Sequence, residues 1–175
     1  MLKKMFGKFA TLFLGKASKP VAGVAGAAVI AMATQFIMPW EGKRNHAYLD
    51  TIASPAVWTV CYGQTGPKAY KGAYYTDAEC LDMLQESVGK YYAEMDKCLT
   101  NKSTPVSVQA SMLELGYNVG TGALCKSTMM RLANAGEYKA ACGELDKWVK
   151  AGGKTINGLV NRRNASKEMC MQDVK

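Results

Sequence analysis

Hydrophobic residues follow three different patterns along the chain. Residues 20–40 form a run of 21 residues without a formal charge, which predicts one apolar helix. Residues 46–75 are rich in Tyr, Val, Trp and Thr and are interrupted by Pro and Gly, which is typical of short strands and turns. Beyond residue 76, apolar residues recur every three or four positions and indicate helices. The order predicts an α+β fold, mainly α, with a small β-lobe and a larger helical lobe flanking a cleft.

The helices of the larger lobe have recognisable starts. Thr76 and Glu79 form a capping-box pattern, and the apolar spacing after it predicts a helix to about residues 95–98. Thr104-Pro105 predicts the next start, and the glycines between residues 116 and 122 predict its end. Further helices are predicted over residues 127–135, 137–151 and 159–171.

The apolar run is long enough to cross a membrane, since 21 helical residues span roughly 30 Å. Its many Ala and Gly residues place the free energy of insertion close to zero. Three interpretations are open. It is a cleaved signal peptide, for which Ala31-Met32-Ala33 has the small-x-small form, a permanent anchor, or a reversible anchor that later leaves the membrane.

The formal net charge of +8 is concentrated at the N-terminus. Residues 1–40 hold five lysines and no acidic residue, which leaves 17 basic against 14 acidic residues in the remainder. Lysines ahead of an apolar span predict an N-terminus in the cytoplasm and a domain outside it. The near balance of the remainder argues against a nucleic-acid partner. We therefore expect an anchor segment, residues 1–40, and a monomeric domain, residues 41–175.

The six cysteines are spread along the chain without a Cys-x-x-Cys pair, and the chain has one histidine. This pattern argues against a structural zinc site, so we expect neither metal nor cofactor. An oxidising compartment with up to three disulfides fits better than buried free thiols. One pairing is disfavoured, because Cys80 and Cys98 would lie about 27 Å apart along an unbroken helix, beyond the roughly 7 Å that a disulfide spans.

Two carboxylates, Glu41 and Asp50, follow the apolar run directly, and Thr59 lies in the strand-like segment beyond them. Glycoside hydrolysis needs such a pair: an acid for the leaving oxygen, and a carboxylate for water or for the sugar carbon. Acidic residues nine positions apart are common by chance, so the pair alone is weak support. His46 lies between them and is expected to be solvated or structural.

Short motifs around this pair and toward the C-terminus carry a resemblance. They are Trp40-Glu41-Gly42 with Tyr48 and Asp50, Trp58-Thr59-Val60-Cys61-Tyr62-Gly63 with Thr65-Gly66, Gly116-Tyr117-Asn118-Val119-Gly120 with Gly122 and Ser127-Thr128, and Trp148, Ala151-Gly152-Gly153 and Gly158-Leu159-Val160-Asn161-Arg162-Arg163. Over essentially its whole length the chain resembles the phage-type lysozymes (muramidases) of glycoside hydrolase family 24, particularly the signal-anchor-release endolysins of lambdoid phages.

The resemblance implies a role for three residues near the anchor. Glu41 would be the general acid, Asp50 would position or activate the attacking water, and Thr59 would help to hold that water. The bond cut would be the β-1,4 linkage between N-acetylmuramic acid and N-acetylglucosamine in peptidoglycan. The family inverts the anomeric centre, so the two carboxyl groups are expected roughly 6.5–9.5 Å apart. The turn between Asp50 and Thr59 is longer than in related endolysins.

The resemblance also names residues for glycan binding. Gln64, Asn118 and Thr128 are the candidates. Gln64 stands where many relatives have a His that would brace the β-lobe, so the loss of that His is expected to affect stability more than chemistry. Arg162 and Arg163 are expected to be surface or ion-paired residues, with contact to the acidic polymer as the alternative.

The apolar run ends at Trp40, directly before Glu41, which suggests a means of activation. While the run lies in the bilayer, Glu41 must sit at the membrane interface. We expect Sec export to the host inner membrane as an inactive, tethered form, followed by release to the periplasm when the potential collapses. Residues 1–60 hold no cysteine, which excludes the anchor-cysteine switch of some relatives. The rival interpretation is a membrane-tethered glycan-binding or structural protein with an inactive lysozyme fold.

Overall fold

The computed structural model describes residues 23–51 and 55–175, which are mainly helical. The elements are α1 (Val24–Glu41), β1 (Arg44–Asp50), β2 (Val57–Cys61), α2 (Asp77–Cys98), α3 (Val106–Val119), α4 (Thr121–Cys125), α5 (Thr128–Asn134), α6 (Tyr138–Gly143), the 3-10 turn η1 (Glu144–Lys147), β3 (Lys150–Ala151), β4 (Lys154–Thr155), α7 (Asn157–Cys170) and the 3-10 turn η2 (Met171–Asp173).

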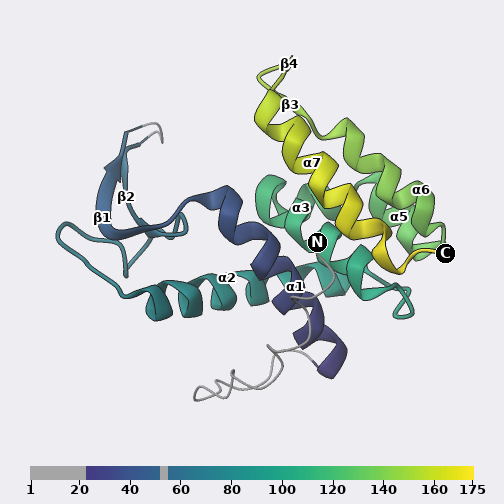
Figure 1. Ribbon diagram of the computed structural model, residues 1–175, viewed down its shortest axis with the longest axis horizontal. Coiled ribbons are helices and arrows are strands. Elements are labelled where there is room, and N and C mark those ends of the chain that lie inside the picture. The colour runs from purple at the N-terminus through teal and green to yellow at the C-terminus, as the bar shows by residue number, and fades with distance from the viewer. Residues whose placement is uncertain (1–22, 52–54) are drawn as a thin grey trace, which may run out of the picture.

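The elements form two lobes (Figure 1). Strands β1 and β2 pair antiparallel at one end of α2, with Tyr48 opposite Thr59 and Asp50 opposite Val57. Helices α3, α5, α6 and α7 gather toward the other end, and α1 and α2 connect the lobes. The predicted fold class, mainly α with a small β-lobe and a larger helical lobe, is confirmed.

Most of the predicted elements are present. The Thr76–Glu79 capping box forms both of its bonds at the start of α2, and the predicted helices at α3, α5 and α7 are confirmed. The helix predicted over residues 137–151 is confirmed only in its first part, because α6 ends at Gly143 and residues 150–155 form the β3–β4 hairpin. Gly152 and Gly153 both have positive φ, which is what a tight two-residue hairpin turn requires. Helix α4 was not predicted.

Helix α1 packs against α2 and α3. Val29, Ala33 and Ile37 lie on its buried face and are fully inaccessible to solvent, whereas Ala27, Ala31 and Gln35 are exposed. By length and composition alone this helix could also cross a membrane. Residues 20–22 of the predicted apolar helix lie outside the described residues. The division between an anchor and a domain at residue 41 stays a prediction.

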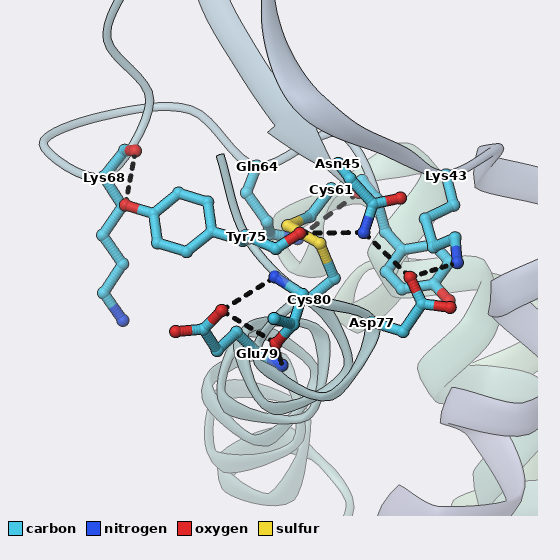
Figure 2. The surroundings of a disulfide bond; sticks show 11 residues. Lys43, Asn45, Cys61, Gln64, Lys68, Tyr75, Asp77, Glu79 and Cys80 are labelled. Carbon is cyan, nitrogen blue, oxygen red and sulfur yellow. Dashed lines mark hydrogen bonds and ion pairs between the residues drawn. A yellow bond between two sulfur atoms is a disulfide. The ribbon is translucent and has the colours of Figure 1, made fainter. Parts of the chain in front are cut away.

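All six cysteines lie in the described part of the chain and form three disulfides. Cys61–Cys80 joins β2 to the first turn of α2 (Figure 2), Cys98–Cys125 joins α2 to α4, and Cys142–Cys170 joins α6 to α7. The predicted exclusion of a Cys80–Cys98 pair is confirmed. The first bridge therefore links the β-lobe to α2, the second links α2 to the helical lobe, and the third lies within the helical lobe.

Candidate active site

Glu41 is the last residue of α1. Gly42 follows it with a φ of +62°, in the left-handed region that favours glycine, and this ends the helix and turns the chain into β1. The Glu41 side chain is 23% exposed. A carboxyl group at this position is held by a helix end yet remains open to solvent.

The segment directly after Glu41 is fixed to the start of α2. Lys43 pairs with Asp77 at 2.6 Å, and the side-chain amide of Asn45 donates to an Asp77 carboxylate oxygen and to the Tyr75 carbonyl, both at 2.8 Å (Figure 2). Hydrogen bonds from Lys43 and Asn45 hold the pKa of Asp77 below its usual value. With Cys61–Cys80 nearby, these contacts hold the β-lobe against α2.

Asp50 and Thr59 lie on one face of the β1–β2 sheet. Asp50 ends β1 and is partly buried, while Thr59 is 3% exposed in β2. Thr59 pairs with Tyr48, two positions before Asp50, so Asp50 and Thr59 are diagonal neighbours. The Thr59 hydroxyl also donates to the Val57 carbonyl at 3.4 Å.

Arg162 of α7 forms an ion pair with Glu41. Its Nη1 donates to Glu41 Oε1 at 2.9 Å, and its Nε donates to Glu114 Oε1 at 2.5 Å. Arg162 is 6% exposed, and Glu114 is fully buried on α3. The expected ion pairing is confirmed, with the Arg162 side chain buried and the Glu41 side chain partly exposed.

Arg163 is fully buried and binds the same carboxylate. Its Nη1 donates to both oxygens of Glu114, at 2.9 and 2.7 Å, and its Nη2 donates to the side-chain oxygen of Asn118. Burial is the largest influence on the pKa of Arg163 and lowers it, while the charge of Glu114 raises it. The amide nitrogen of Asn118 is left for other contacts.

Gln64 links the β-lobe to α3. Its amide nitrogen donates to the Tyr117 hydroxyl at 3.2 Å and to the Tyr62 carbonyl at 3.4 Å. Burial raises the pKa of Tyr117, and the negative charge of Glu41 adds to this rise. Gln64 therefore braces the β-lobe against α3 from the place where a His was expected to be missed, and its contact with glycan stays a prediction.

Thr128 and His46 lie on exposed parts of the surface. Thr128 begins α5 and lines a hollow of about 360 Å³ together with residues that include Ser127 and Arg131. The ring of His46 packs on Tyr74 with centroids 4.7 Å apart, which supports the structural role expected of it. Glycan contact by Thr128 and Asn118 stays a prediction.

The sequence matches the family model described as phage lysozyme over residues 38–166. The chain belongs to the phage lysozyme family. It is 33% identical over 156 residues to the SAR-endolysin of Enterobacteria phage P21, covering 87% of this chain and 94% of that protein. It is 34% identical over 131 residues to the SAR-endolysin of Bacteriophage PS119, covering 75% and 76%.

A solved structure of similar fold is the endolysin of the Escherichia coli phage FAHEc1. It has a TM-score of 0.70 and 25% identity, over 82% of this chain and 92% of that one. The resemblance to phage-type lysozymes, and to the signal-anchor-release endolysins among them, is confirmed. Membership of the family makes this chain a glycoside hydrolase of the lysozyme type.

Sequence reasoning about this phage lysozyme missed Glu114. One signal could have found it: Glu114 is the single charged residue in the sequence of α3, Val106–Val119. A lone charge in an otherwise uncharged helix has to be paired when the helix is buried. Its partners, Arg162 and Arg163, are adjacent in α7 and lie 48 and 49 positions away, so no local pattern links them to Glu114.

Proposed function

We propose that this chain is an endolysin that degrades host peptidoglycan and so lyses the host cell. The bond cut is the β-1,4 linkage between N-acetylmuramic acid and N-acetylglucosamine. The observation that carries the proposal is the placement of Glu41 at the end of α1, oriented by Arg162 and still partly exposed. Asp50 and Thr59, together on one face of the β1–β2 sheet, support it.

Three side chains would share the chemistry. Protonated Glu41 gives its proton to the glycosidic oxygen as the bond to the anomeric carbon breaks. A water attacks that carbon from the opposite face and forms the new C–O bond, while the Asp50 carboxylate takes a proton from the water. The Thr59 hydroxyl helps to hold this water. The product has the inverted configuration.

Gln64, Asn118 and Thr128 would contact the glycan. Asn118 is suited to this because Arg163 occupies its side-chain oxygen and leaves its amide nitrogen to donate to sugar hydroxyls. Gln64 would act from the β-lobe side, next to Tyr117.

Helix α1 would also serve as the reversible anchor. After Sec export the chain would span the host inner membrane with its N-terminus in the cytoplasm, and Glu41 would be held at the interface away from Arg162. Release to the periplasm on loss of the potential would let Val29, Ala33 and Ile37 pack against α2 and α3. Two features support this: the helix is weakly apolar, and half of its exposed residues are alanine.

Turbidity loss of purified cell walls tests the enzymatic role. We expect activity from the full chain, and almost none from Glu41→Gln or Asp50→Asn. Glu168→Gln, an exposed carboxyl of α7, is the matched control and should retain activity. New reducing ends should be N-acetylmuramic acid. Equal activity of wild type and Glu41→Gln would remove Glu41 from its role, and an inactive wild type would favour a glycan-binding protein.

Fractionation of cells before and after an uncoupler tests release. The full-length chain should move from the membrane pellet to the soluble periplasmic fraction as lysis begins. Ala27→Leu with Ala31→Leu makes the exposed face of α1 more apolar without changing its buried face, and each leucine favours insertion by about 0.3 to 0.6 kcal/mol. This variant should stay in the pellet and delay lysis. Lysis with the wild-type chain still in the pellet would contradict release.

A further inference from the structure

Arg162 binds two carboxylates through different nitrogens, Glu114 through Nε and Glu41 through Nη1. We infer that Glu114 is a positioning residue, which holds the Arg162 guanidinium in the orientation that fixes the general acid. The inference rests on the proposed function of Glu41. Glu114 acts through Arg162, whose Nε it binds at 2.5 Å, while Arg162 Nη1 binds Glu41 at 2.9 Å.

The Glu114 carboxylate is itself held by several donors. Oε1 accepts from Arg162 Nε and from Arg163 Nη1, and Oε2 accepts from Arg163 Nη1 at 2.7 Å and from the Ser166 hydroxyl at 2.9 Å. Glu114, Arg163 and Ser166 are fully buried. A carboxylate fixed in this way is a rigid support for a flexible arginine.

The orientation of Arg162 depends on its two carboxylates. Its third nitrogen, Nη2, is buried and has no hydrogen-bond partner among the described residues. A guanidinium is planar, so fixing Nε through Glu114 also fixes the direction in which Nη1 points. Loss of the Glu114 contact would leave the Arg162 head free to rotate away from Glu41.

The charges of the cluster explain why it accepts the end of α1. Arg162 and Arg163 face Glu114 alone within the helical lobe, which leaves one buried positive charge without a counter-charge. Glu41 supplies it when α1 is packed. Buried charges are costly unless paired, so the helical lobe presents a carboxylate receptor, and Glu114 keeps that receptor in place.

A positioning role predicts a kinetic effect that packing alone would not produce. A small misplacement of a catalytic group lowers the rate of the chemical step, whereas substrate binding is left intact. Glu114→Gln should lower kcat about 10- to 100-fold, as expected for loss of a charge-assisted hydrogen bond, with KM unchanged. Ser166→Ala is the matched control, because it removes a neutral donor from the same carboxylate and leaves both arginine contacts.

The experiment measures initial rates of the full chain over a range of peptidoglycan concentrations, with melting temperature and free-thiol count as folding checks. The rescue variant combines Glu114→Ser with Ser166→Glu, which returns a carboxylate to the same pocket from α7. It should recover most of the lost kcat. If Glu114→Gln does not fold, Glu114→Gln with Arg163→Met removes one charge of each sign, and it should show the same fall in kcat.

Full kcat in a folded variant without the Glu114 carboxylate would overturn the inference. An equal fall in kcat for Ser166→Ala, or a change confined to KM, would also overturn it. So would failure of both Glu114→Gln and its combination with Arg163→Met to fold, because any of these results would make the role of Glu114 structural only. An active wild type with an unaffected Glu114→Gln contradicts this inference alone. An inactive wild type contradicts the proposed function instead.

Discussion

Arg162 Nη1 lies 2.9 Å from Glu41 Oε1, although the two residues are 121 positions apart in the chain. The contact joins the last residue of α1 to α7 and is the point where the apolar N-terminal helix meets the charged interior of the helical lobe. When α1 packs on the helical lobe, the Glu41 carboxyl group is therefore placed against Arg162 at the same time. A change in either partner should affect stability and activity together.

Replacement of Arg162 by Gln should lower both the stability and the activity of the protein. Removing one partner of a buried ion pair typically costs about 3–5 kcal/mol, and we expect the lower end because Arg163 still pairs with Glu114. The free energy of unfolding is measured by urea denaturation, with Arg131→Gln, an exposed arginine of α5, as the control. A loss below about 1 kcal/mol in Arg162→Gln would show that the pair contributes little.

Local signals explain which parts of the fold could be predicted. The capping box at Thr76 and the helical spacing after it define α2 through contacts three or four residues apart. The Glu41–Arg162 contact has no local signal, because it depends on how α1, α3 and α7 pack. Gly152-Gly153 fits a helix end and a hairpin turn equally well on local grounds, which is why the β3–β4 hairpin was not predicted. Glu41, Asp50 and Thr59 came from a family motif, which carries no information on their partners.

Ile37→Ala should destabilise the released protein. Ile37 is fully buried on the face of α1 that packs on the domain, and truncation of such a side chain costs about 2–5 kcal/mol. Gln35 lies on the exposed face of the same helix, so Gln35→Ala should change stability by no more than about 0.5 kcal/mol. Urea denaturation of the soluble chain gives both values. Equal stability of the two variants would mean that α1 is not packed as described.

The Cys61–Cys80 disulfide should contribute about 3 kcal/mol of stability, as expected for a loop closed over a sequence separation of 19 residues. Replacing both cysteines by serine removes the bridge between β2 and α2, while the ion pair at Glu41 is retained. We therefore expect a clear fall in melting temperature and retained activity at low temperature. Replacement of Cys142 and Cys170 is the comparison, since that bridge lies within the helical lobe. Unchanged melting in both variants would contradict a stabilising role.

Tyr117 should make the protein less stable in alkali. Burial raises the pKa of Tyr117 above its usual value of 10.0, so the folded state favours the neutral phenol. This contribution to stability is fully present below pH 10.0 and is lost as the pH rises through the raised pKa of the folded state. Glu41 strengthens the effect, because its negative charge opposes a phenolate nearby.

Tyr117→Phe removes this group from the titration. At neutral pH it should lower the free energy of unfolding by no more than about 1.5 kcal/mol, because it loses the hydrogen bond from Gln64. Above pH 10.0, the variant should lose stability less steeply than the wild type. Urea denaturation across this range measures the slope, with Tyr70→Phe, which is 58% exposed, as the control that should follow the wild type. Parallel slopes for Tyr117→Phe and wild type would place the alkaline sensitivity in another group, because a phenol that ionises equally in both states contributes no pH dependence to folding.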